Sequence, residues 1–279
     1  MWVGQQLADG LDFWGFLGSL ILGGIILGIY TGLLGYVGAK TGLSLDLLSQ
    51  RAFGEKGSYL PSAMTSFTQI GWFGVGSFVS GGTATPNFAR FAKDGKSGAI
   101  TTVVAFFIGN SLMFFFGAVS SIFVGGNDIF EVMVRLNLFY LAVLVLGLNI
   151  WTTNDNALYT AGLGLANIFH QRKKPMVLLS GIIGTVASVW LYYNFCGWLN
   201  ILNCTLPPVG MILVLAYFMN KEDFETDQPK LKTVDWFAVA GVILGAIVAN
   251  LLHWGIASIN GMVVAAVCYC VGQAVNKRK

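Results

Sequence analysis

The sequence predicts an all-α integral membrane protein, and two observations carry this prediction. Of the 279 residues, 55% are hydrophobic and only 10% are charged, and the mean hydropathy is +0.70, whereas a soluble globular domain is about 25% charged. The apolar residues also gather in runs of about 20, the length that a helix needs to cross a bilayer. Because lipid offers no partner to an open backbone amide, each run is expected to be helical.

Seven of the runs have a conventional length and composition. They cover residues 13–39, 99–124, 138–168, 176–195, 197–219, 234–253 and 255–275. An eighth run, 60–91, is about as apolar, but it carries a glycine-rich sequence at 71–76 and Pro86 near its end. We therefore expect a single transmembrane domain over residues 1–279, with seven or eight hydrophobic segments.

Basic loops between the runs predict which ends of the helices face the cytoplasm. The strongest positive bias lies at 172–174, at 277–279 and at 90–96, and alternating crossings connect these three segments consistently. The loop 40–56 is also weakly basic, yet only the eighth run, 60–91, separates it from 90–96. Three explanations stay open: this run is a re-entrant pair of half-helices, one weak charge bias misleads, or helices are absent from this place.

Signatures of an enzyme are missing from the sequence. The two histidines lie in a basic loop and at a helix end, so they cannot form a catalytic triad or a zinc cluster at membrane depth. The four cysteines lack the spacing of a zinc site or a disulfide framework and are interpreted as packing residues. We expect no enzymatic activity and no bound cofactor. The net charge of +3 describes membrane topology rather than affinity for nucleic acid.

The densest polar sequence inside an apolar run is 149–156, which reads Asn-Ile-Trp-Thr-Thr-Asn-Asp-Asn. Polar groups at membrane depth are costly and tend to be functional. Hydroxyl, amide and carbonyl oxygens are hard ligands that suit a sodium ion, and transporters place such ions at discontinuous helices. The alternative is that these side chains join neighbouring helices by hydrogen bonds.

Two further clusters combine polar and aromatic side chains. Gln69 and Trp72 lie within one helical turn, so the amide could read the edge of a polar ring while the indole stacks on its face. Ser77, Phe78 and Ser80 offer two hydroxyls and another ring, followed by two glycines. The alternative for both clusters is ordinary helix packing, since glutamine, serine and glycine are common at helix contacts in membranes.

On these clusters the sequence closely resembles the purine and cytosine permeases of the nucleobase-cation symporter family, in particular the bacterial cytosine permease branch. The matching stretches are 28–31, 34–43, 69–76, 109–114, 146–159 and 181–185, and the resemblance covers nearly all of the chain. It implies a LeuT-type inverted-repeat fold with twelve helices, of which this chain supplies fewer. The fold is therefore expected to be incomplete.

The resemblance also implies a nucleobase site and a sodium site. The residues around the base would be Gln69, Trp72, Ser77, Phe78, Ser80 and Asn149. Trp72 and Phe78 would sandwich the ring, and the polar side chains would bond to its edges. The sodium ion would lie at Thr152 and Thr153, with Asn149.

Two departures from the family pattern accompany this resemblance. Several helices normally separate the motif that ends at Gly76 from the motif that begins at Ser77, so the sequence predicts a deletion junction near 76/77. The junction lies in the run 60–91, whose two flanking loops are both basic although only one apolar run separates them. Residues 1–4 resemble the middle of the family's first helix, so its cytoplasmic half is expected to be absent.

We therefore expect a multi-pass protein of the cytoplasmic (inner) membrane that takes up cytosine or a related nucleobase with sodium by alternating access. Its partners would be the small-molecule substrate, sodium and lipid, without nucleic acid. One alternative is a non-transporting, truncated membrane protein derived from such a permease. Another, a membrane enzyme, would need a histidine or acid cluster that the sequence lacks. The exact substrate, and coupling to protons rather than sodium, stay open.

Overall fold

The computed structural model describes residues 12–75, 83–125, 129–226, 229, 231–252 and 254–276. Within these residues the chain forms helices, turns and loops, without a strand, so the predicted all-α class is confirmed. In chain order the helices are α2 (Phe13–Thr41), α3 (Leu45–Phe53), α4 (Tyr59–Val75), α5 (Pro86–Ala89), α6 (Gly95–Val104), a π-helical segment (Ala105–Gly109), α7 (Asn110–Val124), α8 (Ile129–Arg135), α9 (Phe139–Phe169), α10 (Lys173–Tyr193), α11 (Phe195–Met219), α12 (Lys221–Glu225), α13 (Trp236–Leu251) and α14 (Ala257–Asn276).

Each of the seven conventional apolar runs contains a long helix, and capping side chains explain some shifted bounds. α6 begins at Gly95, four residues before the predicted start, because Asp94 accepts a hydrogen bond from the Ser97 amide (2.8 Å). α13 begins two residues late, where Asp235 accepts from the Ala238 amide (3.2 Å). The short helices α3, α5, α8 and α12 were not predicted, because none contains an apolar run of membrane length.

Five of the described helical spans are long and apolar enough to cross a membrane. They are Phe13–Thr41, Gly95–Val124, Lys173–Leu191, Gly197–Met219 and Ala257–Asn276. α13 is apolar but only 16 residues long, and α9 is 31 residues long but contains the polar run 149–156. Helices of this kind suggest a multi-pass membrane protein.

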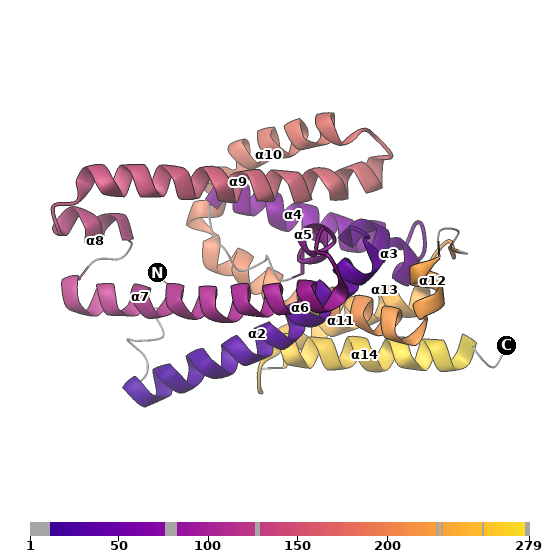
Figure 1. Cartoon of the computed structure of the whole chain (residues 1–279). Coiled ribbons are helices and arrows are strands. Elements are labelled where there is room, and N and C mark those ends of the chain that lie inside the picture. The colour runs from indigo at the N-terminus through magenta and orange to yellow at the C-terminus, as the bar shows by residue number, and fades with distance from the viewer. Residues whose placement is uncertain are drawn as a thin grey trace.

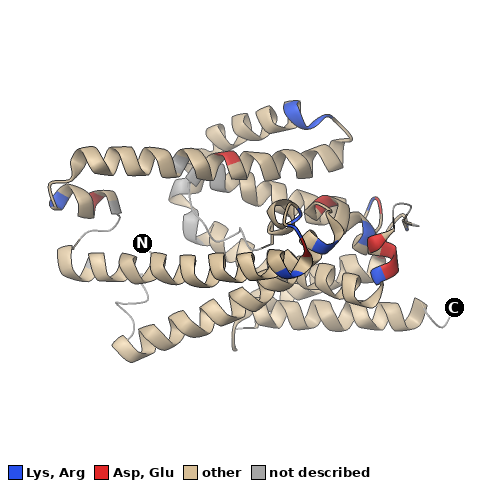
Figure 2. Ribbon diagram, viewed as in Figure 1, with Lys and Arg blue, Asp and Glu red and all other residues tan. Residues whose placement is uncertain are grey.

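The long helices lie side by side, and the charged side chains gather mainly at one end of the molecule (Figures 1 and 2). We call this the charged end; it comprises residues 40–58, 90–96, 170–174, 221–226 and 231–235. Its loops are bonded to one another. Arg51 donates to the Asp223 carbonyl oxygen (2.7 Å), and the Glu55 amide donates to the Lys232 carbonyl oxygen (2.8 Å). The C-terminal end of α14 lies at the same end (Figure 1).

The eighth apolar run, 60–91, is not one continuous described helix. α4 covers its first part and stays helical through Gly71 and Gly74, and α5 lies near its end. Residues 76–82, which contain the predicted junction, lie outside the described residues. The backbone is helical through Val75, and a re-entrant turn beyond this residue stays a prediction.

Both loops whose charges conflicted in the sequence lie at the charged end. The Asn87 side chain, which precedes the basic segment 90–96, accepts a hydrogen bond from the Leu45 amide (2.8 Å), and Leu45 begins a helix within the loop 40–56. This common position agrees with the basic character of both loops. The chain leaves the charged end along α4 and is back at that end by Asn87.

The helices around this region pack as two groups. α2 packs against α5, α6, the π-helical segment and α7, whereas α4, α9 and α10 pack against one another. A third set, α11, α13 and α14, contacts both groups, mainly through α11. The largest cluster of buried apolar side chains joins the third set to α2 and α3, with Leu34, Phe53, Ile212, Val242 and Tyr269 at most 2% exposed.

Small residues let α13 and α14 approach one another closely. A Cβ atom on Gly245 would lie 2.6 Å from the Gly261 carbonyl oxygen and 3.2 Å from Cγ of Pro208 on α11. Lipid tails are as apolar as the helices, so close van der Waals contact of this kind is a main source of helix association in membranes. The three helices meet at this point.

A buried polar network ties α3 to α4 and α9 at the charged end. Asp46 accepts a hydrogen bond from the Ser62 hydroxyl (2.6 Å), and the Asn167 amide nitrogen donates to Ser62 (2.8 Å) and Ser58 (3.1 Å). Gln50 donates to the Asn167 oxygen (2.6 Å). Burial raises the pKa of Asp46 to about 6, although the Ser62 bond lowers it in part.

The glycine contact predicts that Gly245→Ala lowers the melting temperature of the detergent-purified chain, with a loss of roughly 1–3 kcal/mol, because the added methyl group forces α13 away from α14. The matched control is Gly23→Ala on α2, where a Cβ would meet nothing within 4 Å. Alanine favours helix over glycine, so this control should keep or raise the melting temperature. Equal losses in both variants would contradict the close contact.

The raised pKa of Asp46 predicts a pH dependence of stability. A carboxyl group with a higher pKa in the folded than in the unfolded state favours folding at acidic pH, and this contribution is lost as the pH rises from about 4 to about 6. Asp46→Asn should flatten the melting temperature over this window and raise stability at pH 7, by at most about 3 kcal/mol.

Asp94→Asn is the control for this experiment. Hydrogen bonds from Ser97 lower the pKa of Asp94, so this carboxyl titrates below the window. If the pH profile of Asp46→Asn matches that of the unsubstituted chain, Asp46 is not the group responsible.

Candidate functional site

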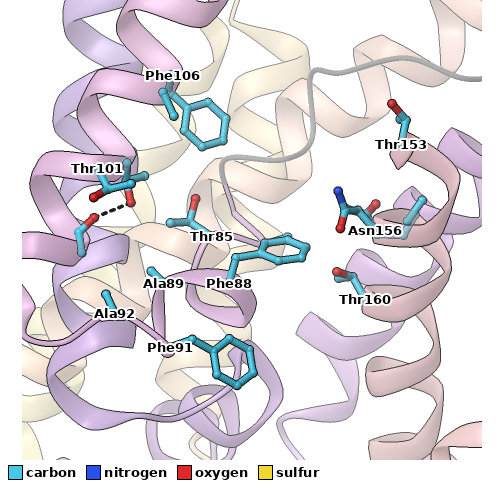
Figure 3. A pocket seen from close by; sticks show the side chains of 16 residues that line it. Thr85, Phe88, Ala89, Phe91, Ala92, Thr101, Phe106, Thr153, Asn156 and Thr160 are labelled. Carbon is cyan, nitrogen blue, oxygen red and sulfur yellow. Dashed lines mark hydrogen bonds between the residues drawn. The ribbon is translucent and has the colours of Figure 1, made fainter. Parts of the chain in front are cut away.

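A cavity of about 590 Å³ lies between the two helix groups (Figure 3). Its volume falls within the roughly 300–1,000 Å³ typical of small-molecule sites. It is lined by Gln69, Ala84, Thr85, Phe88, Ala89, Phe91, Ala92, Gly98, Thr101, Thr102, Ala105, Phe106, Thr153, Asn156, Ala157 and Thr160. None of these residues is charged, so the cavity suits a neutral solute better than an ion.

One wall of the cavity is a polar face of α9. Thr153, Asn156, Ala157 and Thr160 follow the spacing of a single helix face, and Figure 3 shows the three polar side chains on neighbouring turns beside the cavity. Thr153 donates to the side-chain oxygen of Asn149 (3.3 Å), one turn earlier. The polar run predicted at 149–156 therefore continues toward the charged end as far as Thr160.

α4 adds Gln69 to this wall, and its register against α9 fixes the depth of the amide. The Ser66 hydroxyl donates to the Ala161 carbonyl oxygen (3.2 Å), and the two helices run in opposite directions (Figure 1). Gln69, about one turn beyond Ser66, therefore lies near the level of Ala157 and Thr160. Its side chain is 6% exposed.

The opposite wall is aromatic and comes from α5, the loop after it and the π-helical segment. Phe88 and Phe91 carry rings that are 42% and 73% exposed, and Figure 3 shows the Phe88 ring directed toward Asn156 and Thr160. Phe106 belongs to the π-helical segment, a local distortion that is frequent at functional sites. The exposed rings show that the cavity is open on one side.

Two cationic side chains meet at Tyr159, next to the cavity wall. Arg90 donates to its hydroxyl oxygen (2.5 Å), and the ammonium nitrogen of Lys173 lies 3.5 Å from the centre of its ring. Both cations belong to the charged end. The cavity therefore lies in the half of α9 that is nearer to this end.

The structure brings together only part of the predicted nucleobase site. Gln69 lines the cavity, whereas Asn149 is exposed and does not. Trp72 lies within α4, but its side chain is outside the described part of the structure. Ser77, Phe78 and Ser80 also lie outside the described residues. The predicted sandwich of two rings thus stays a prediction.

The predicted sodium residues offer the oxygen donors that this ion prefers. Thr152 donates to the carbonyl oxygens of Leu148 (3.2 Å) and Asn149 (3.1 Å), and Thr153 donates to the Asn149 side chain. Each hydroxyl proton is used within α9, so lone pairs of both hydroxyl oxygens stay free for a cation. Oxygen donors of this kind suit a hard cation, but Asn149 and Thr152 are exposed and only Thr153 lines the cavity, so the sodium site stays a prediction.

Sequence reasoning did not single out Phe88, Phe106, Asn156 or Thr160. Asn156 belonged to the polar run but was not selected as a site residue, and the helical period from Asn149 through Thr153 could have extended the face to Thr160. The two phenylalanines had no comparable signal, because their positions depend on α5 and on the π-helical distortion.

The family model for permeases of cytosine/purines, uracil, thiamine and allantoin matches residues 1–83 and 75–274 of this chain. The chain is 36% identical, over 372 residues, to the cytosine permease of Escherichia coli (strain K12), a match that covers all of this chain and 88% of that protein. It is 34% identical, over 82 residues, to the allantoin permease of Bacillus subtilis (strain 168), which covers 29% of this chain and 16% of that protein.

Two features of these matches concern the predicted junction. The aligned region of 372 residues is 93 longer than the 279 residues of this chain, although the whole chain takes part in it. The family model matches in two pieces that meet at residues 75–83. Both features support the prediction that the relatives contain a segment that this chain lacks. The exact position of the junction, at 76/77, stays a prediction.

The relatives are permeases, which are transporters and not enzymes. A family model that matches nearly the whole sequence, and a relative 36% identical over all of it, agree with the all-helical architecture described above. This chain belongs to the family of permeases for cytosine/purines, uracil, thiamine and allantoin.

Proposed function

We propose that this chain transports cytosine or a related nucleobase across the cytoplasmic membrane together with sodium. The observation that carries the proposal is the uncharged cavity between the two helix groups, which combines aromatic rings with the polar side chains of Gln69, Thr153, Asn156 and Thr160. A nucleobase is a flat ring whose edge carries donors and acceptors, so it needs both kinds of contact. The similarity to a cytosine permease supports this choice of substrate.

The packing supports a mechanism by alternating access. α2, α5, α6 and α7 pack as one group, and α4, α9 and α10 pack as another, with the cavity between them. The described contacts between the groups include the Arg90–Tyr159 hydrogen bond and the Phe88–Tyr159 ring contact, whose centroids are 6.2 Å apart. In a LeuT-type transporter, one bundle rocks against the other around a fixed site, and we assign this chain an incomplete version of that fold.

The charged end is assigned to the cytoplasm, because basic loops favour the inner side of the membrane. The cavity then lies in the cytoplasmic half of α9. Sodium at Asn149, Thr152 and Thr153 would favour the substrate-competent state by its higher affinity for that state, and this difference in affinity is the coupling. Because all 279 residues align with a curated permease, we favour transport over a non-transporting remnant.

Equilibrium binding of radiolabelled cytosine to the detergent-purified chain tests the proposal. Gln69→Leu should weaken binding by about tenfold or more, because the loss of one buried hydrogen bond to the substrate is worth roughly 1–3 kcal/mol. Gln171→Leu is the matched control, since Gln171 lies in an exposed loop away from the cavity and should bind as the unsubstituted chain does. Replacement of sodium by choline should lower the affinity.

The outcomes separate the parts of the proposal. Absence of cytosine binding by a folded, monodisperse sample, with other nucleobases also inactive as competitors, removes the transport assignment. Binding that is unchanged without sodium removes only the coupling ion. Equal losses in the Gln69 and Gln171 variants place the site elsewhere.

A further inference from the structure

Thr160 on α9 carries a hydroxyl group that its own helix leaves unused. The side chain is 2% exposed, and its oxygen has no hydrogen-bond partner. Several hydroxyls in the described helices donate to the carbonyl oxygen four residues earlier, as Thr31, Thr41, Thr102 and Thr205 do at 2.6–2.8 Å. Burial without a partner disfavours a hydroxyl, so this group points to a ligand.

The position of the Thr160 hydroxyl along α9 indicates that a ligand held by Gln69 could also contact Thr160. The register set by Ser66 and Ala161 places Gln69 near the level of Thr160, whereas Asn149 lies eleven residues earlier on α9, about 16 Å away along the helix. A nucleobase whose edge contacts Gln69 is thus close to Thr160 and Asn156. Thr160 and Asn156 are therefore nearer than Asn149 to a base held by Gln69.

The face of such a ring would also be covered here. Figure 3 shows Phe88 on the opposite wall, with its ring directed toward Asn156 and Thr160. Phe88 is 42% exposed, and Asn156 is exposed as well, so both have surface available for contact inside the open cavity. A ring placed between the walls would present its face to Phe88 and its edge to α9.

We propose that Thr160 and Asn156 are specificity-determining residues, which together with Gln69 read the hydrogen-bonding edge of the nucleobase. The proposal deepens the transport function stated above and rests on it. A threonine hydroxyl can donate one hydrogen bond and accept others, and an asparagine amide also does both. The pair can therefore match the ring nitrogen and exocyclic amino group of cytosine, and the orientation of the Asn156 amide decides whether it matches these groups or the N–H and carbonyl of uracil.

Binding of radiolabelled cytosine to purified variants, with competition by unlabelled uracil, tests this inference. Thr160→Val keeps the shape of the side chain and removes the hydroxyl, so cytosine affinity should fall about tenfold and the preference for cytosine over uracil should change. Thr160→Ser should restore most of the affinity. Asn156→Leu, at an exposed position, should change the same preference.

Thr205→Val serves as the control, because the Thr205 hydroxyl is already bonded to the Ile201 carbonyl oxygen (2.8 Å) on α11 and does not line the cavity. It should leave affinity and preference unchanged. Unchanged affinity and preference in both Thr160→Val and Asn156→Leu overturn the inference.

The design separates this inference from the proposed function. If Gln69→Leu loses cytosine binding and the α9 variants keep it, the inference fails while the transport function stands. If the unsubstituted chain binds no nucleobase, both fail.

Discussion

In the interior of a bilayer no water is available to satisfy a polar group, and this constraint shapes every level of the structure. The backbone meets it by forming helices. The side chains meet it by bonding within their own helix, as Thr31 and Thr102 do, or across helices, as Ser66 does with α9. A polar group that does neither stands out against this background, and Thr160 is such a group.

The same constraint explains which features the sequence could predict. Apolar runs of membrane length can only be helices, so the seven conventional runs were predicted, with errors of a few residues where Asp94 and Asp235 cap a helix. The short helices α3 and α12 have no such signal, because they lie at the charged end, where loops and helices are both allowed. The conflict of charges around 60–91 proved informative, since both flanking loops lie at that end.

The sequence could predict those parts of the candidate site that a local pattern within a single helix marks. The polar run 149–156 marked α9 as the functional helix, and Gln69 was recognised on α4. Their relative depth depends on the pairing of Ser66 with Ala161, which no local pattern reveals, so the amide lies near Thr160 rather than Asn149. Phe106 joins the cavity through the π-helical segment, and such a distortion depends on packing between helices rather than on periodicity.

The central claim is that the cavity between the two helix groups is where the nucleobase binds, and protection of a cysteine from a water-soluble maleimide tests it most directly. In a chain whose four cysteines are replaced by alanine, Ala89→Cys places a thiol in the cavity lining, and Lys93→Cys places one nearby on an exposed loop outside it. The account predicts that cytosine slows the labelling of Ala89→Cys and leaves that of Lys93→Cys unchanged. Equal labelling of Ala89→Cys with and without cytosine, in protein that still binds the ligand, would contradict it.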